Sequence, residues 1–194
     1  MKIIGLIKKF ILHPDVIYYH LYSHIRVLKC RFNRNIRIGR NPLIEKGSVL
    51  STLGGGKIVI GNNCRLYMRS FILSWGGDII IGDNFSLNAF STLYGQGGVT
   101  IGNNVMIAGQ CTIIPASHTF ERVDIPMVEQ PQMKKGIVIE DDVWIGTGVR
   151  ILDGVTIRKG CVIGAGTVVT KSTEPYSVYV GVPGVKIKDR LKNN

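Results

Sequence analysis

The amino-acid sequence predicts an all-β solenoid of about six coils, each built from 18 residues. Three observations predict it: aliphatic residues recur at every sixth position, the recurrence keeps one phase, and every interruption follows a third repeat. Each six-residue unit gives a short strand and a turn, and three units close one coil that stacks on its neighbours. The eighteen positions in phase are all Ile, Leu or Val: Ile38, Ile44, Leu50, Ile60, Leu66, Ile72, Ile81, Leu87, Leu93, Ile101, Ile107, Ile113, Ile139, Ile145, Ile151, Ile157, Ile163 and Val169.

The interruptions predict where the chain turns and where a loop leaves the solenoid. Between successive sets of three they add 4, 3, 2, 20 and 0 residues. The long insertion predicts a protruding loop over residues 114–136. A β-sandwich is disfavoured, because it has no reason to keep one phase over six coils. The short insertions contain glycines, which suit tight corners with positive φ: Gly54-Gly55-Gly56, Trp75-Gly76-Gly77 and Gly95-Gln96-Gly97-Gly98.

Residues 1–36 lack the repeat and are expected to form a helical segment. His13-Pro14-Asp15 is typical of a helix start, with proline in the first turn. Residues 15–30 are rich in aromatic and apolar groups and end in cations, which predicts one amphipathic helix, with a shorter helix over residues 2–12. The repeat then covers residues 37–182, and residues 183–194 are expected to form a basic C-terminal tail or a short helix.

The formal charge of +11 is concentrated at the N-terminus, where residues 1–40 hold nine Lys and Arg residues and one acidic residue, Asp15. This segment favours peripheral contact of residues 1–36 with anionic lipid at the cytoplasmic face of a membrane, with a cap on the solenoid as the alternative. No nucleic-acid-binding motif accompanies the charge, so nucleic acid is not expected as a partner. The N-terminal apolar run is too short for a secretion signal or a membrane span, and the four widely spaced cysteines predict a reducing, cytoplasmic compartment.

The stretch Ile137–Lys188 carries a family resemblance, in WIGTGVRILDGVTIRKGCVIGAGTVVTK and then EPYSVYVGVPGVKIK. It resembles the hexapeptide-repeat acyltransferases, and among them the branch of maltose, galactoside and exopolysaccharide O-acetyltransferases. The resemblance covers about residues 36–190. It implies a left-handed parallel β-helix, a homotrimer with active sites between subunits, and acetyl-CoA as co-substrate.

The long insertion holds the only histidine of the solenoid, His118, in the segment Pro115-Ala-Ser-His-Thr-Phe120. The resemblance matches His118 to the catalytic loop histidine of the family. A sugar hydroxyl is a poor nucleophile near neutral pH, and an imidazole with an ordinary pKa of ~6.5 can accept its proton in the transition state. No Ser or Cys nucleophile stands in a recognisable elbow, so direct transfer is expected. Glu121 or Asp124 could orient the imidazole, with ordinary loop solvation as the alternative for both.

The resemblance also assigns residues to the acceptor. Asn88 aligns with an asparagine that binds acceptor in the family, and a stacked corner amide is the alternative role. Tyr94 and Gln96 lie on the corner insertion that precedes the loop, and they are weaker candidates for contact with a sugar.

For acetyl-CoA, small residues along one face would let the thin pantetheine arm lie against backbone amides. A backbone N–H near Gly146-Thr147 is expected to stabilise the oxyanion. Val185 stands where the family often has Arg or Lys, so a phosphate contact there is not expected. The cofactor-binding candidates are Trp144 at the acetyl end, Thr147 and Ala165 along the pantetheine, and Thr170, Lys171 and Lys188 near the 3′-phosphate.

The sequence thus predicts an acetyl-CoA-dependent O-acetyltransferase that acts on a hydroxyl of a sugar or a polysaccharide precursor. Two alternatives stay open: an N-acyltransferase acting on an amino sugar or an antibiotic, and a non-catalytic structural or binding solenoid. Carbonic anhydrases with similar solenoids need three histidines for zinc, and one histidine in the repeat predicts no metal site.

Overall fold

The structure is a computed structural model that describes residues 14–190, and its first element is helix α2 (Pro14–Arg31). This helix covers the range expected over residues 15–30, with Pro14 in the first turn. The shorter helix expected over residues 2–12 lies outside the described residues. No helix in the described part of the chain is long and apolar enough to cross a bilayer.

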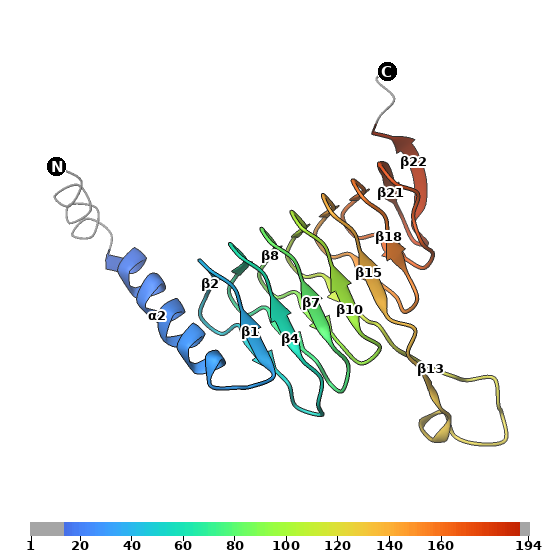
Figure 1. Ribbon diagram of the computed structural model, residues 1–194. Helices are drawn as coiled ribbons and strands as arrows, with labels where there is room; N and C mark the ends of the chain where they lie inside the picture. The colour runs from blue at the N-terminus through green and yellow to red at the C-terminus, as the bar shows by residue number, and fades with distance from the viewer. Residues whose placement is uncertain (1–13, 191–194) are drawn as a thin grey trace.

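The remainder is a left-handed parallel β-helix, which confirms the predicted fold class (Figure 1). Its strands form three sheets along the solenoid axis. The first sheet contains β1 (Ile36–Ile38), β4 (Ile58–Ile60), β7 (Ile79–Ile81), β10 (Val99–Ile101), β15 (Ile137–Ile139) and β18 (Thr156–Ile157). The second contains β2 (Leu43–Ile44), β5 (Arg65–Leu66), β8 (Ser86–Leu87), β11 (Met106–Ile107), β16 (Trp144–Ile145), β19 (Val162–Ile163), β21 (Ser177–Val180) and β22 (Val185–Asp189). The third contains β3 (Val49–Ser51), β6 (Phe71–Leu73), β9 (Thr92–Tyr94), β12 (Thr112–Ile113), β17 (Arg150–Ile151) and β20 (Val168–Val169).

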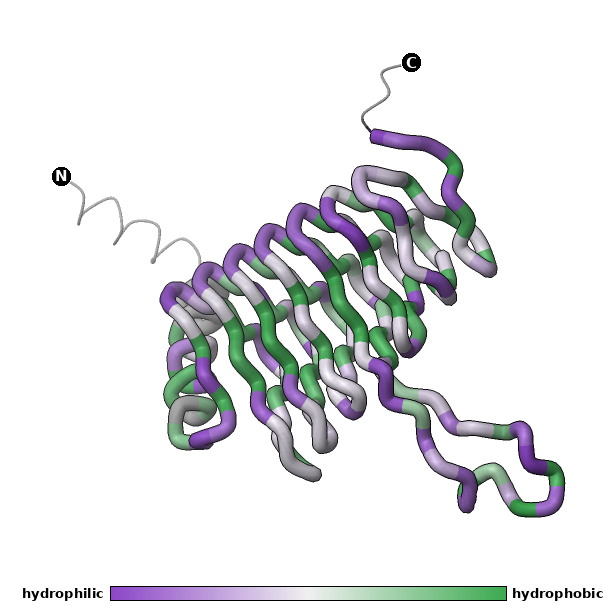
Figure 2. The backbone as a smooth tube through the Cα atoms, turned by 45° about the vertical axis from the view of Figure 1, so that its right-hand side comes forward, coloured by the Kyte–Doolittle hydropathy of each residue, from purple (hydrophilic) through white to green (hydrophobic). Residues whose placement is uncertain are grey.

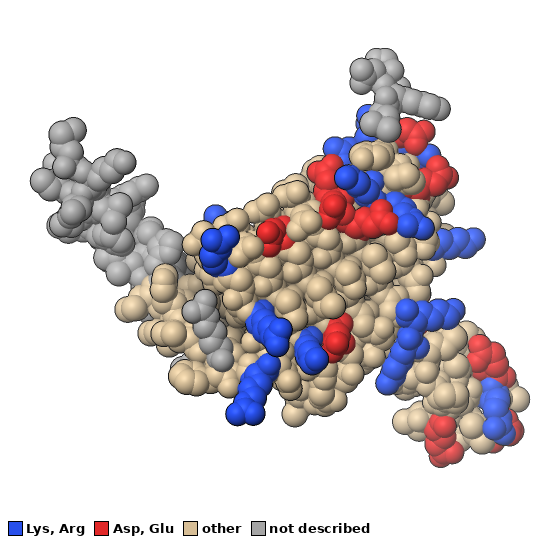
Figure 3. All heavy atoms as spheres, viewed as in Figure 1, with Lys and Arg blue, Asp and Glu red and all other residues tan. Residues whose placement is uncertain are grey.

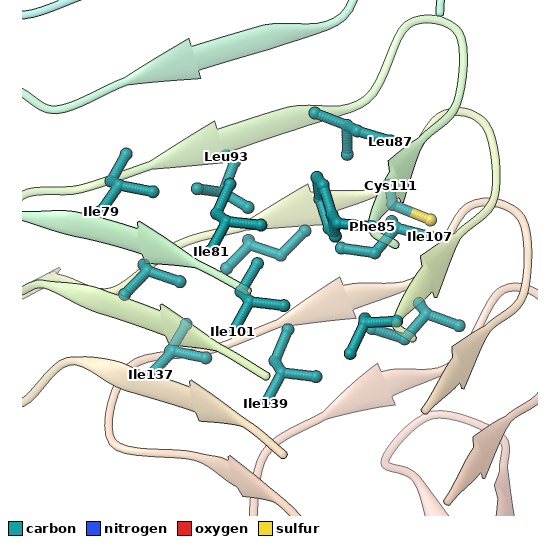
Figure 4. Packing of buried hydrophobic residues seen from close by; sticks show 14 of the residues in the cluster. Ile79, Ile81, Phe85, Leu87, Leu93, Ile101, Ile107, Cys111, Ile137 and Ile139 are labelled. Atoms are coloured by element: carbon teal, nitrogen blue, oxygen red, sulfur yellow. The ribbon is translucent and has the colours of Figure 1, made fainter. Parts of the chain in front are cut away.

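The core is the stack of inward-pointing aliphatic residues (Figure 4). Of the eighteen positions in phase, all are buried except Ile38 and Leu50, which are partly buried and contact the core. The register is in phase from coil to coil, so that Ile81 pairs with Ile60 on one side and with Ile101 on the other. Full burial of one such side chain stabilises a fold by ~1.5–3 kcal/mol, and each coil depends on its neighbours for that burial.

Three corners join the sheets, and the first corner, between the first and second sheets, is built from asparagine. Asn63, Asn84 and Asn104 adopt positive φ values of 56°, 56° and 58°, which asparagine tolerates better than most residues. Their side-chain amides form a ladder, with Asn63 donating to Asn84 and Asn84 to Asn104 at 3.2 and 2.9 Å. Figure 2 shows this hydrophilic row along one edge of the solenoid. The second corner lies between the second and third sheets. The third corner joins the third sheet of one coil to the first sheet of the next coil, and it carries all the insertions.

Helix α2 closes the N-terminal end of the solenoid (Figure 1). The Ser23 hydroxyl accepts a hydrogen bond from the backbone N–H of Ile44 at 2.8 Å, which satisfies a group of the first coil. The Arg26 guanidinium donates to the Ser48 carbonyl, and Val27 is buried against the core. The helix therefore covers apolar and backbone groups that no preceding coil could cover.

The C-terminal segment differs from the expected basic tail or short helix. Strand β21 continues the second sheet parallel to β19, and β22 returns antiparallel to it. The Lys186 ammonium pairs with the carboxylates of Glu174 (2.6 Å) and Asp189 (2.5 Å), which anchors this return strand. The alternation in residues 185–189 is a strand pattern that the high cation content of the segment obscured.

Candidate active site

The loop over residues 114–136 leaves the solenoid at the third corner, and its ends are fixed (Figure 1). Strands β13 (Ser117–His118) and β14 (Gln132–Met133) pair antiparallel. The residues that connect them include the 3₁₀ helix η1 (Met127–Glu129). At the base, the Asp153 carboxylate accepts hydrogen bonds from the N–H of Gly136 and of Lys135, each at 2.9 Å. A Cβ on Gly97 would lie 2.0 Å from the Pro115 carbonyl oxygen, so only glycine lets the loop base lie against the preceding coil.

His118 projects from this hairpin and is exposed. Its Nε2 atom lies 3.0 Å from Nε2 of Gln132, which stands directly opposite on β14. Gln132 was not identified in the sequence, because antiparallel pairing across a loop without a repeat leaves no periodic signal. Among the described residues, His118 has no hydrogen bond to either predicted orienting carboxylate.

Both of those carboxylates have other partners. The Arg122 guanidinium pairs with Asp124, with Nε 3.0 Å from Oδ1, and holds the pKa of this exposed carboxyl below its ordinary value. The Glu121 carboxylate accepts a hydrogen bond from the backbone N–H of Phe120 at 3.0 Å. In this geometry Gln132, and neither Glu121 nor Asp124, contacts the imidazole.

The third corner also carries an aromatic pair in the coils before the loop. The rings of Trp75 and Tyr94 have centroids 4.9 Å apart with an interplanar angle of 32°, and Trp75 is 43% exposed. The side-chain oxygen of Gln96 is buried and has no partner within the described chain. Because Gly97 contacts Pro115, three residues before His118, the structure brings Tyr94, Gln96 and the base of the His118 loop to one corner.

The second corner holds Asn88. Its side-chain N–H donates to the Ile107 carbonyl at 2.9 Å, as a stacked corner amide would. Among the described residues, the amide oxygen has no partner, so it can accept a hydrogen bond from a ligand. The Asn88 amide can therefore stabilise the corner through its N–H and still offer its oxygen to a ligand.

In the last two coils, the bare part of the second corner has glycine, and therefore no side chain, at its positive-φ position. At the position with positive φ, the second, third and fourth coils carry Arg69, Phe90 and Gln110, and the last two coils carry Gly148 and Gly166. Gly47 holds this position in the first coil, but the Arg69 side chain covers it, with Cγ 2.9 Å from where a Cβ would lie. A Cβ on Gly166 would meet no atom within 4 Å. The backbone of these two coils is therefore open to a slender ligand.

Thr147 and Ala165 lie on this bare corner, as the pantetheine prediction requires. The N–H of Gly146 donates to the Ile163 carbonyl at 2.8 Å, and that of Gly148 donates to the Gly109 carbonyl at 3.0 Å. The N–H of Thr147 has no acceptor in residues 14–190. A free N–H of this kind can stabilise an oxyanion or bind an amide. Arg150, which the sequence analysis did not select, stands beside the corner and donates to the Gly148 carbonyl at 2.9 Å.

The remaining cofactor candidates are not all on this corner. Trp144 is 53% exposed on the outer face of the second sheet, between Met106 and Val162. Thr170 and Lys171 follow β20 at the third corner, and Lys188 lies on β22 at the end of the second sheet. All three are exposed. Cationic and anionic side chains are intermixed at this end of the molecule (Figure 3).

Lys186 differs from Lys171 and Lys188, because its ammonium group forms ion pairs within the fold. Asp189 and Glu174 hydrogen-bond its ammonium and raise its pKa above the ordinary value of lysine. The cation next to Val185 is therefore already paired with two carboxylates.

Within one chain, the acceptor, pantetheine and base candidates fall into two groups on opposite edges of the third sheet, and Thr170 and Lys171 lie on the same edge as the His118 loop. Asn88, Thr147 and Ala165 lie on the second corner, and Tyr94, Gln96 and the His118 loop lie on the third. Residues 14–190 contain no group of three or more His, Cys, Asp or Glu side chains that could hold a metal ion.

The family described as "Bacterial transferase hexapeptide (six repeats)" matches residues 136–171. The putative lipopolysaccharide biosynthesis O-acetyl transferase WbbJ of Escherichia coli is 31% identical over 165 residues, which cover 81% of each chain. The dTDP-4-amino-4,6-dideoxy-D-glucose acyltransferase of Escherichia coli is 31% identical over 160 residues, which cover 80% of this chain and 82% of that protein. The chain belongs to the hexapeptide-repeat acyltransferase family.

A solved structure extends the comparison to the fold of this hexapeptide-repeat acyltransferase. A serine-to-cysteine mutant of AntD, an N-acyltransferase from Bacillus cereus in complex with dTDP-4-amino-4,6-dideoxyglucose and coenzyme A, superposes with a TM-score of 0.75. It is 27% identical, and the match covers 88% of this chain and 90% of AntD. Other acetyltransferases, galactoside O-acetyltransferases among them, match over 31–59% of their own length.

Proposed function

We propose that this hexapeptide-repeat acyltransferase transfers an acetyl group from acetyl-CoA to a hydroxyl of a sugar or of a polysaccharide precursor. The observation that carries the proposal is His118, displayed on a fixed hairpin and held by Gln132 at 3.0 Å. A base is what a sugar hydroxyl needs, since its own acidity is too low to supply an alkoxide. The likeness to WbbJ supports an O-acetyltransferase.

In the proposed reaction, His118 takes the hydroxyl proton as the oxygen attacks the thioester carbon. A C–O bond forms, and the carbonyl oxygen becomes an oxyanion, which the free N–H of Thr147 stabilises. Collapse breaks the C–S bond, and the proton passes from His118 to the sulfur of coenzyme A. Proton transfer by such a base contributes ~10²–10⁴-fold to the rate.

For acetyl-CoA, the proposed site is the bare second corner, where Gly148, Gly166 and Ala165 leave room for the pantetheine arm. Trp144 would flank the acetyl end. Thr170, Lys171 and Lys188 remain candidates for the adenosine and 3′-phosphate end, and Arg150 is a further cation beside the corner. The structure of AntD with coenzyme A supports this class of co-substrate.

The active site is proposed to form between subunits of a homotrimer. The third sheet separates the His118 loop from Asn88 and Thr147 within one chain. If copies pack around a threefold axis, the third corner of one copy can face the second corner of the next. Each site would then combine His118, Tyr94 and Gln96 of one copy with the acceptor and cofactor groups of its neighbour.

The cytoplasm is the proposed compartment. All four cysteines are free, and Cys64, Cys111 and Cys161 are buried. Burial raises the pKa of the Cys64 and Cys111 thiols. Free thiols are typical of a reducing compartment.

N-acylation of an amino sugar is the second candidate, and the matches to the dTDP-4-amino-4,6-dideoxy-D-glucose acyltransferase and to AntD, over 80% and 88% of this chain, favour it. Incubation with acetyl-CoA and matched panels of sugars and amino sugars, followed by mass spectrometry, tests both. Mild alkali removes an acetyl group that is bound as an ester, whereas an acetyl group that is bound as an amide remains. Release of no coenzyme A with any acceptor would favour a non-catalytic solenoid.

A further inference from the structure

Helix α2 exposes a continuous apolar face. Leu21, Ile25, Leu28 and Phe32 are 60%, 46%, 55% and 88% exposed. Their spacing of four, three and four residues places Leu21, Ile25 and Leu28 on one side of the helix, and Phe32 continues the row in the turn directly after it. Four large apolar side chains in one row differ from the single exposed apolar residues that any surface carries.

This face is not the one that caps the solenoid. Ser23, Arg26 and Val27 make the contacts to the first coil, and Ser23 and Val27 are buried. The cap is therefore complete without the row of Leu21, Ile25, Leu28 and Phe32, which we call the α2 row.

The chain around the α2 row is strongly cationic. Residues 16–44 contain six Lys and Arg residues and no Asp or Glu. Arg34, Arg37 and Arg40 are exposed. Leu28 also lines a pocket of about 530 Å³ between α2 and the first coils, and Arg65 adds a further cation to its lining. The one acidic residue of α2 is Asp15 in its first turn, and over residues 15–44 six Lys and Arg residues stand against it.

We propose that the α2 row docks on a membrane surface that contains anionic phospholipid. The apolar row would enter the boundary between headgroups and acyl chains, while the cations meet lipid phosphates. A second copy of this chain is disfavoured as the occupant, because it would bring two cationic surfaces together. Nucleic acid would use the cations and leave the apolar row exposed. The inference rests on this surface alone and goes beyond the proposed acetyl transfer.

Flotation of the full chain with vesicles tests the proposal without any catalytic step. The probes are vesicles of phosphatidylglycerol mixed equally with phosphatidylcholine, and of phosphatidylcholine alone. The test variant combines Leu21→Gln, Ile25→Gln and Phe32→Gln, which keeps every charge and leaves the lining of the pocket intact. The matched control combines Val123→Gln, Met127→Gln and Val128→Gln, which removes three exposed apolar side chains from the loop over residues 114–136.

The wild type and the control are expected to float with the anionic vesicles and not with phosphatidylcholine alone. The test variant is expected to lose at least about tenfold in vesicle affinity, with an unchanged thermal unfolding midpoint, and raised salt is expected to weaken binding by the wild type. Equal flotation of test variant and wild type, or no flotation of the wild type, would overturn the proposal. A change in oligomeric state of the test variant, without a change in flotation, would assign the row to a second copy.

Discussion

His118 and Gln132 lie directly opposite each other on β13 and β14, with their Nε2 atoms 3.0 Å apart. A carboxamide offers both a donor and an acceptor. Its N–H₂ would occupy the one lone pair of a neutral imidazole, whereas its oxygen, turned into the same place, accepts an Nε2–H and leaves Nδ1 free to take the hydroxyl proton. Gln132 is therefore proposed as a positioning residue, which would fix the ring that is proposed to take the hydroxyl proton.

Gln132→Ala is expected to lower kcat by about tenfold or more, because the imidazole loses its only hydrogen-bond partner among the described side chains. The KM for acetyl-CoA is expected to stay unchanged. Steady-state kinetics measures both, and Gln132→Glu is expected to move the acid limb of the pH–rate profile to higher pH. Met133→Ala, on the same strand, is the control. An unchanged pH profile in Gln132→Glu would contradict the positioning role.

Gly166→Asn is expected to raise the KM for acetyl-CoA by about tenfold or more. Asparagine tolerates the φ of +71° at this position, and its side chain would enter the open space along the second corner. The control is Gly47→Asn, at the equivalent position of the first coil with a φ of +79°. Equal effects of the two substitutions on KM would place acetyl-CoA elsewhere.

Mixed oligomers test whether the site is shared between copies. His118→Ala and Asn88→Ala are each expected to be nearly inactive alone. Unfolded together in equal amounts and refolded, they are expected to regain activity, because random assortment restores both residues in about a quarter of the sites between copies. No gain over the separate variants would mean that each site is built within one chain.

Glu140 is expected to stabilise the fold only above acid pH. Arg158 (2.8 Å) and the backbone N–H of Lys159 (2.7 Å) hold its pKa below the ordinary value. The contribution is therefore present above the ordinary pKa of ~4.3 and is lost as the pH falls through the lower folded pKa. Urea unfolding should show Glu140→Gln less stable than the wild type at pH 7, by less than ~1 kcal/mol since the pair is partly exposed, and equally stable in strong acid. A difference that persists in acid would indicate a packing effect.

The solenoid could be predicted from the sequence because each inward-pointing position must be apolar. Burial therefore leaves an aliphatic residue at every sixth position. Ile81, Ile101 and Ile139 stand in one phase, and they stack on one another in the structure. The helix over residues 15–30 had a comparable local signal in Pro14 and in the apolar composition that follows. These elements depend on local rules, so one chain suffices to predict them.

The site was less accessible to prediction, because its geometry depends on long-range pairing. Gln132 meets His118 through a hairpin whose register no repeat encodes. The pairing of Lys186 with Glu174 and Asp189, which anchors β22, likewise joins residues whose contact no spacing predicts. The division of the candidates between two corners follows from the coil geometry, which no local segment of the sequence encodes.

The most direct test of acetyl transfer is the product formed from acetyl-CoA and a panel of sugars and cell glycans, analysed by mass spectrometry. The wild type is expected to release coenzyme A and to yield an acetylated carbohydrate whose acetyl group is removed by mild alkali. His118→Ala is expected to fold normally and to lower the rate by ~10²–10⁴-fold. Turnover by His118→Ala equal to that of the wild type, or a product that resists alkali, would contradict the proposed base-assisted transfer to a hydroxyl.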